Sequence, residues 1–293
     1  MSRLVKWLLF RYVRAKSHFY LPLFYTYRVK KLNHSHIIKQ VLAGQWGALV
    51  IAIGFSAPPY VLNACFLLLL NFSCAVIYEI GYWENDVIGE KYEARPTLSR
   101  TYAQYKDELN LQTAAPWYWA ISITLFAFVL QSVSQLDAAT SAIETLLRIW
   151  PLVLGNAGIW LSYLVAIRIT FSIYNRLNER SRIWVYPILQ AQRLFGFALV
   201  LPLNTVGAIL LLSLVVSRWM NYTVYRCGGD RQLIAFQLLC LCMFTISFLA
   251  LVIGSSAPAT FVTWQSAIAF MYLAIRGLRE ASRLGISLDL LNP

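Results

Sequence analysis

The feature that most constrains this chain is a series of apolar runs that repeats along most of its length. Each run is close to the roughly 20 residues that a helix needs to cross a bilayer. Hydrophobic residues make up 59% of the 293 residues and charged residues only 13%, whereas an ordinary soluble domain has about 25% charged residues. Open sheets leave backbone groups unsatisfied in lipid, so the runs are expected to be helices. The sequence therefore predicts an all-α, polytopic membrane protein.

Breaks between the apolar runs predict where the helices cross. The run from 185 to 216 has 32 residues, with Pro202 and Asn204 inside it. It is too long for one upright helix, and we interpret it as two short spans joined by a tight turn. With it the sequence predicts about eight spans, or eight to nine, around a central cavity. The other predicted spans cover about residues 37–55, 60–82, 116–133, 147–171, 233–253 and 258–275.

The positions of Lys and Arg support this count. They gather in the N-terminal segment, in the loops at 84–112, 173–183 and 217–232, and in the C-terminal tail, while "SAPP", "PLNT" and "GSSAP" on the other side contain none. Basic residues collect on the cytoplasmic side of a membrane. Both termini and the three charged loops are therefore expected in the cytoplasm, and the membrane is expected to be a bacterial-type inner (plasma) membrane.

The same distribution accounts for the net charge of +12. Because Lys and Arg flank the spans of any membrane protein in this way, no nucleic-acid partner is expected. Protein partners stay unknown. Within the chain we expect a basic, aromatic membrane-surface segment at 1–36, a single transmembrane helical domain at 37–277 and a cytoplasmic tail at 278–293.

Acidic residues are concentrated in one short stretch. Seven of the thirteen carboxylates lie between residues 79 and 108. If the second helix continues past the membrane surface, Glu79, Asp86, Glu90 and Glu93 return to one helical face, because they are spaced i, i+7, i+11 and i+14. Oxygen donors on one face, beside Asn85, suit Mg²⁺, which also takes phosphate oxygens. A solvated helix face paired with neighbouring Lys and Arg is the alternative.

Two further groups of residues favour phosphate recognition. "YNRLNERSR" places Tyr174, Arg176 and Arg180 after the fourth span, and guanidinium groups bind phosphate oxygens in a bidentate manner. Ordinary flanking charge explains the same pattern. Arg193 lies about two turns inside the fifth span, so we expect it to face a polar interior cavity rather than lipid. The loop "SRWMNYTVYRCGGDRQ" adds Tyr222, Tyr225, Arg226 and its only carboxylate, Asp230.

These three loops together resemble the UbiA-type intramembrane prenyltransferases. Asn85-Asp86 match the N-D pair of the family motif N-D-x-x-D-x-x-x-D, Glu93 stands at its last Asp, and Arg95-Pro96 resemble the R-P pair that follows. The segment "YNRLNER" looks like the basic Y-x-x-x-K/R element of that family. This chain departs from the family at Gly89, at Asn178 and in a second Asp-rich motif reduced to Asp230, and its apolar runs leave no ninth helix.

The resemblance implies nine helices around a cavity and a Mg²⁺-dependent reaction. A prenyl diphosphate would give its polyprenyl group to an acceptor that the sequence does not identify. The resemblance gives catalytic roles to Asp86 and Glu93. The implied Mg²⁺ ligands are Asp86, Glu90, Glu93 and Asp230. The residues expected to bind substrate are Asn85, Arg95, Tyr174, Arg176, Arg180, Arg193, Tyr222, Tyr225 and Arg226.

Two other functions stay open. Gly89 and the reduced second motif favour a non-catalytic membrane subunit, derived from the same fold, that binds a lipid, a lipid phosphate or a partner without performing chemistry. A transporter or flippase ranks third: Glu79 and Arg193 at membrane depth allow it, but the chain shows no symmetry between two halves. The acceptor, the prenyl chain length and the oligomeric state are not determined by the sequence.

Overall fold

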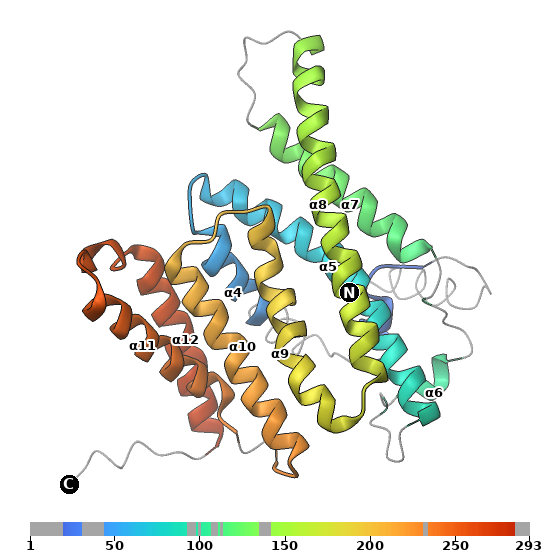
Figure 1. Ribbon diagram of the computed structural model, residues 1–293, viewed down its shortest axis with the longest axis vertical. Coiled ribbons are helices and arrows are strands. Elements are labelled where there is room, and N and C mark those ends of the chain that lie inside the picture. The colour runs from blue at the N-terminus through green and yellow to red at the C-terminus, as the bar shows by residue number, and fades with distance from the viewer. Residues whose placement is uncertain are drawn as a thin grey trace, which may run out of the picture.

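The computed structural model describes residues 20–30, 44–92, 98, 101–106, 111, 114–134, 142–230 and 234–284. Within these ranges every regular element is a helix (Figure 1). The described part of the chain is therefore all-helical, as predicted. Five of its helices are long and apolar enough to cross a membrane, which is consistent with an integral membrane protein. They are α5 (Tyr60–Tyr92), α7 (Ala115–Val133), the part of α8 from Ile149 to Arg176, α10 (Thr205–Arg226) and α11 (Phe236–Gly254).

The remaining elements are shorter or more polar. The whole of α8 spans Ala142–Arg176, and α9 (Glu179–Phe195) leads through the 3₁₀-helix η3 (Gly196–Leu199) toward α10. The last helix, α12 (Trp264–Arg283), follows a 3₁₀ turn, η5 (Pro258–Thr260). Short elements before α5 and between α5 and α7 are α2 (Phe24–Arg28), α4 (Gly47–Leu49), the π-helix η2 (Val50–Gly54) and α6 (Tyr102–Tyr105).

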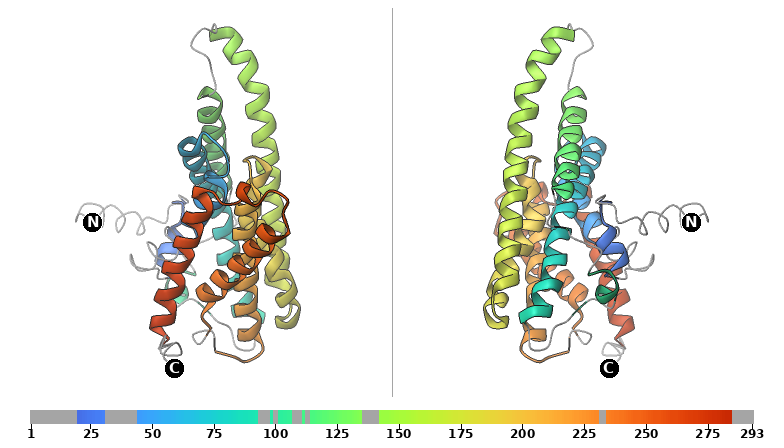
Figure 2. Two further views of the ribbon diagram at one scale, coloured as in Figure 1. Left: turned by 90° about the vertical axis from the view of Figure 1, so that its left-hand side faces the viewer. Right: turned by 90° about the vertical axis from the view of Figure 1, so that its right-hand side faces the viewer.

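The long helices run roughly along one common axis and form a bundle, from which α8 projects farthest (Figures 1 and 2). Three packing groups make up the bundle: α5 with α7 and α8, α9 with α10, and α11 with α12. Helix α10 also contacts α11 and η2. The bundle therefore has α5, α8, α9 and α10 around its middle, where the candidate site lies.

The turn predicted inside the apolar run 185–216 is present. Helix α9 ends at Phe195 and α10 begins at Thr205. The Asn204 side chain accepts a hydrogen bond from the Gly207 N–H at 2.9 Å, which satisfies one of the donors that a helix start leaves unpaired. Several helices extend beyond the predicted spans, because the end of an apolar run marks the end of lipid contact and not the end of helical backbone.

Close backbone contacts hold this part of the bundle together. A Cβ at Gly207 would lie 2.0 Å from the Ala52 carbonyl oxygen, so α10 can meet η2 at this distance only with glycine there. Gln265 on α12 donates to the Ile51 carbonyl at 2.7 Å and accepts from Asn204 at 2.6 Å. The first bond satisfies a backbone carbonyl of the irregular helix η2, and the second joins the side chains of α12 and of the turn before α10.

Residues 20–30, which fall in the predicted membrane-surface segment, pack against α5. Tyr25 and Val29 are buried in a small cluster with Val76, Trp83 and Tyr102. The Thr101 hydroxyl donates to the Val29 carbonyl at 2.8 Å. This segment is thereby placed beside the acidic face of α5.

Candidate functional site

Glu79 is a structural acceptor for the N-terminal segment. Its side chain is fully buried and accepts hydrogen bonds from the Tyr20 hydroxyl, from the Leu23 N–H at 2.9 Å and from the Thr26 N–H at 2.6 Å. Burial, together with the Glu79 carboxylate, raises the pKa of Tyr20, so this phenol remains a donor. Glu79 therefore fixes the start of α2 on α5.

Asp86 and Glu90 lie farther along the same face of α5, as their spacing predicts. The fully buried Asp86 accepts from the Tyr25 hydroxyl at 2.6 Å, and the Lys30 Nζ is 3.0 Å from both of its carboxylate oxygens. Burial and the Asp86 charge raise the pKa of Tyr25. Glu90 is paired instead with Lys106 Nζ at 2.6 Å and the Tyr102 hydroxyl at 3.0 Å.

These pairings bear on the expected Mg²⁺ site. Asp86 forms an ion pair with Lys30, and Glu90 forms one with Lys106. Asp230 is exposed beyond the end of α10. Glu93 and Arg95 lie outside the described residues. Among the described residues there is no group of three or more His, Cys, Asp or Glu side chains that could hold a metal ion. Mg²⁺ requires several oxygen ligands around one point, and the described carboxylates do not fit it in this arrangement.

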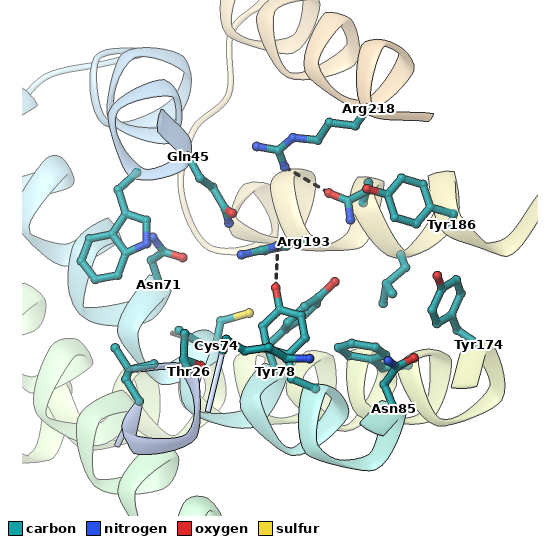
Figure 3. A pocket seen from close by; sticks show the side chains of 18 of the residues that line it. Thr26, Gln45, Asn71, Cys74, Tyr78, Asn85, Tyr174, Tyr186, Arg193 and Arg218 are labelled. Atoms are coloured by element: carbon teal, nitrogen blue, oxygen red, sulfur yellow. Dashed lines mark hydrogen bonds between the residues drawn. The ribbon is translucent and has the colours of Figure 1, made fainter. Parts of the chain in front are cut away.

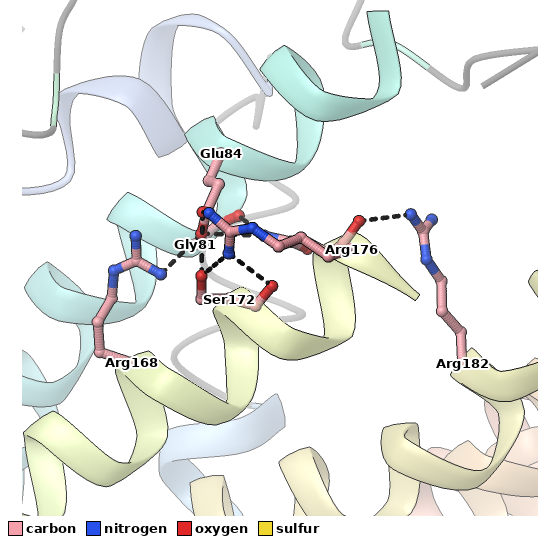
Figure 4. Close-up of polar contacts among 7 residues, drawn as sticks. Gly81, Glu84, Arg168, Ser172, Arg176 and Arg182 are labelled. Atoms are coloured by element: carbon pink, nitrogen blue, oxygen red, sulfur yellow. Dashed lines mark hydrogen bonds and ion pairs between the residues drawn. The ribbon is translucent and has the colours of Figure 1, made fainter. Parts of the chain in front are cut away.

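Glu84 points from α5 toward α8 and compensates two guanidinium groups there (Figure 4). It pairs with Arg168 Nη1 at 2.7 Å and Arg176 Nη2 at 2.9 Å, and accepts from the Ser172 hydroxyl at 3.1 Å. Arg176 also donates to the Ser172 hydroxyl and carbonyl. Arg176, expected to bind substrate, is thus engaged in joining α5 to α8.

A cavity of about 730 Å³ lies beside this cluster, at the ends of α5 and α8. Lys91, Arg176 and Arg182 line it together with Glu84 and Glu179. Arg182 is buried and donates to the backbone carbonyls of residues 175 and 177, at 2.8 and 2.9 Å. Because both cations and carboxylates line it, this cavity has no excess of positive charge strong enough to favour an anionic ligand.

The central cavity has a different character. It encloses about 680 Å³ between α5, α8, α9, α10 and the segment at 23–30. Its polar lining combines three cations, Lys30, Arg193 and Arg218, with side-chain amides. None of the described residues that line it is Asp or Glu. The amides are Gln45, Asn71, Asn85, Gln190 and Asn221, and the aromatic walls are Tyr27, Trp46, Tyr78, Tyr82, Phe171, Tyr174, Tyr186 and Phe236.

Neutral groups surround the two arginines of this cavity (Figure 3). The Arg193 guanidinium lies 4.5 Å from the centroid of the Tyr78 ring and donates to the Tyr82 hydroxyl at 3.4 Å. Arg218 donates to the Gln190 Oε1 at 3.0 Å. Figure 3 shows Arg218 on one side of the cavity, Tyr78 and Asn85 on the opposite side, and Arg193 between them. A charge held away from water is costly unless an opposite charge compensates it.

Asn71 adds an unused donor to the same cavity. Its side chain is buried in α5, and its Nδ2 atom has no hydrogen-bond partner among the residues that the structure describes. Buried polar groups in native structures are nearly always paired, so an exception calls for an explanation. A ligand rich in acceptor oxygens would pair with this amide as well as with the guanidinium groups.

The three loops singled out in the sequence contribute to this one cavity. Asn85, Tyr174 and Arg193 line it, as does Asn221 from the third loop. Tyr222 lies next to this lining. Its hydroxyl bonds Tyr174 at 2.8 Å and accepts from Arg226 Nε at 2.9 Å. The other predicted substrate-binding residues of these loops that the structure describes are not among the lining residues. The Arg226 guanidinium carbon lies 5.6 Å from the centroid of the Tyr225 ring, and the Arg180 side chain is exposed.

Sequence reasoning missed Lys30, Arg218 and Asn71 as lining residues, and it missed the ion pair between Glu84 and Arg168. A charged residue inside an apolar span was the available signal for Arg168. Arg218 carried the same signal, but the predicted span stopped at residue 216, whereas α10 continues to Arg226. Lys30 gave no local signal, since its place depends on a contact with Asp86, 56 residues away.

No protein-family model, curated protein or solved structure matches this chain. The function must therefore be inferred from the chemistry of the cavity.

Proposed function

We propose that this chain is an integral membrane protein that binds the phosphate headgroup of a lipid in its central cavity. One observation carries the proposal. Arg193 and Arg218 bring two positive charges into a cavity in which no described lining residue is acidic. Arg168 and Arg176, which share the carboxylate of Glu84, are by contrast compensated by a charge on the neighbouring helix.

The ligand is inferred to be a phosphate ester because of the donors that face the cavity. Guanidinium groups bind phosphate oxygens through charge-assisted hydrogen bonds. The unpaired Asn71 Nδ2 supplies a further donor. A ligand of this kind would supply the negative charge that the described lining lacks.

The ligand is inferred to be a lipid because of the walls and the position of the cavity. Aromatic side chains form much of the lining, and α5, α8 and α10 are all apolar enough to cross a membrane. A volume of about 680 Å³ falls within the roughly 300–1,000 Å³ typical of small-molecule sites. It accommodates a phosphate headgroup and the first part of an isoprenoid or acyl chain.

The proposed topology has eight spans with both termini in the cytoplasm. Besides the five helices already described, it requires α9, α12 and the segment that includes residues 44–54 to cross the membrane. The basic residues at the ends of α8, α10 and α12 support this orientation. A reporter that is active only in the cytoplasm should work when fused to either terminus, and activity at one terminus alone would mean an odd number of spans.

The proposed function is tested with two probes that have the same isoprenoid tail and differ only in their headgroup. Purified protein in detergent, with EDTA present, is titrated with farnesyl phosphate and with farnesol. Because the cavity is cationic, we expect farnesyl phosphate to bind at least about tenfold more tightly, which corresponds to one charge-assisted hydrogen bond. Equal affinities of the two probes would reject a headgroup site.

A Mg²⁺-dependent prenyltransferase of UbiA type is the second candidate. The convergence of Asn85, Tyr174 and Asn221 on one cavity favours it, because these residues come from the three loops that resemble that family. Under this proposal Asp86 and Glu93 act in catalysis, with Mg²⁺ as cofactor and a prenyl diphosphate as substrate. Release of diphosphate from farnesyl diphosphate that requires Mg²⁺, and that Asp86→Ala with Glu93→Ala abolishes, would establish it; release unchanged in that variant would exclude it.

A further inference from the structure

The ion pair between Lys30 and Asp86 has an unusual position. Asp86 is fully buried on α5, while the Lys30 side chain is 24% exposed and lines the central cavity. The Lys30 ammonium lies 3.0 Å from each oxygen of this carboxylate, and the Tyr25 hydroxyl donates to one of them at 2.6 Å. The carboxylate therefore already holds a cation, and that cation faces the cavity.

The surrounding contacts hold Lys30 in this place. Glu79 anchors the beginning of the segment through the backbone N–H groups of Leu23 and Thr26. Asp86 anchors the end of the segment by accepting hydrogen bonds from the Tyr25 hydroxyl and the Lys30 ammonium. Lys30 Nζ also lies 5.6 Å from the centroid of the Tyr82 ring, and the Tyr82 hydroxyl accepts from Arg193. Lys30 and Arg193 thus approach the same tyrosine.

We propose that Lys30 is a third phosphate-binding cation of the cavity, held by Asp86 at the point where a divalent metal would otherwise be expected. This inference rests on the proposed function. A lysine ammonium has three donors, so Lys30 can bond the Asp86 oxygens and still direct a donor toward a phosphate oxygen. Headgroup binding is then independent of metal ions, because the protein supplies the cation itself.

The test uses farnesyl phosphate and the full-length protein in detergent. With EDTA present, Lys30→Met should bind this probe roughly 10- to 100-fold more weakly than the wild type, the range of one charge-assisted hydrogen bond. Methionine keeps much of the length of the lysine stem beside Tyr25 and Tyr82. Lys30→Arg should retain most of the affinity, and addition of Mg²⁺ should leave wild-type binding unchanged.

Two further variants separate binding from folding. Lys106→Met is the matched control, because Lys106 forms the same kind of pair with Glu90 but is absent from the residues that line the cavity; it should bind as the wild type does. The double variant Lys30→Met/Asp86→Asn leaves no unpaired buried charge, and it should bind as weakly as Lys30→Met.

The outcomes distinguish this inference from the proposed function. Wild-type affinity in Lys30→Met or in the double variant, or wild-type binding that requires Mg²⁺, would overturn the role of Lys30 while leaving a headgroup site in place. If the wild type does not prefer farnesyl phosphate to farnesol, the proposed function itself fails.

Discussion

Replacing Arg193 with glutamine should weaken the binding of farnesyl phosphate by roughly 10- to 100-fold, because a charge-assisted hydrogen bond contributes about 1.5–3 kcal/mol. The ligand-free protein should be at least as stable as the wild type. Arg193 is surrounded by Tyr78 and Tyr82, and the described lining of its cavity contains no carboxylate. Arg193 is partly buried, and removing a charge that its described surroundings do not compensate relieves a desolvation cost.

Both quantities can be measured on one preparation. Titration with farnesyl phosphate in EDTA gives the affinity, and thermal unfolding without the probe, followed by tryptophan fluorescence, gives the stability. Arg218→Gln should behave in the same way, since Arg218 bonds the neutral Gln190. Arg283→Gln is the control, because that side chain is 66% exposed near the end of α12. A variant of Arg193 that unfolds more easily but binds normally would show that this arginine is structural.

Replacing Glu84 with alanine should destabilise the ligand-free protein by about 3 kcal/mol, the lower end of the cost of removing one partner from a buried ion pair, because Arg168 and Arg176 are themselves 18% and 59% exposed. Glu84 is only 3% exposed and pairs with both Arg168 and Arg176. Its loss leaves Arg168, which is 18% exposed, without its carboxylate within an apolar span. The contact between α5 and α8 should weaken with it.

The stability of this variant is measured by denaturation in detergent and compared with that of Glu179→Ala. Glu179 is 64% exposed and lies 3.5 Å from Arg226, so its loss should change the free energy of unfolding by no more than about 1 kcal/mol. Equal effects of the two substitutions would mean that the Glu84 cluster does not hold α5 to α8.

The sequence was sufficient to predict the helical class of the fold and several of its long apolar helices. Apolar runs of membrane-spanning length fix the positions of α5, α7, α10 and α11, and Pro202 with Asn204 marks the turn before α10. These features are local, since they depend on composition over one helix and on residues that stop or cap a helix. The count of eight spans stays a prediction.

The candidate site was only partly predictable. Arg193 was expected to face a polar cavity, and it lines one. The acidic face of α5 was expected to offer ligands to a metal, but two of its carboxylates are paired with Lys30 and Lys106. A periodic pattern shows that side chains share a face but does not show what packs against that face. The partners come from segments distant in sequence, and only the tertiary structure brings them together.

The location of the bound phosphate tests the central claim most directly. Solid-state NMR on protein with ¹⁵N-labelled arginine, in lipid with farnesyl phosphate and EDTA, measures the distance from phosphorus to the guanidinium nitrogens. The cavity predicts a contact of about 4 Å, which hydrogen bonding to phosphate oxygens requires. This contact should disappear in the double variant Arg193→Gln/Arg218→Gln. No such contact in the wild type, or one that persists in the double variant, would contradict a phosphate site in the central cavity.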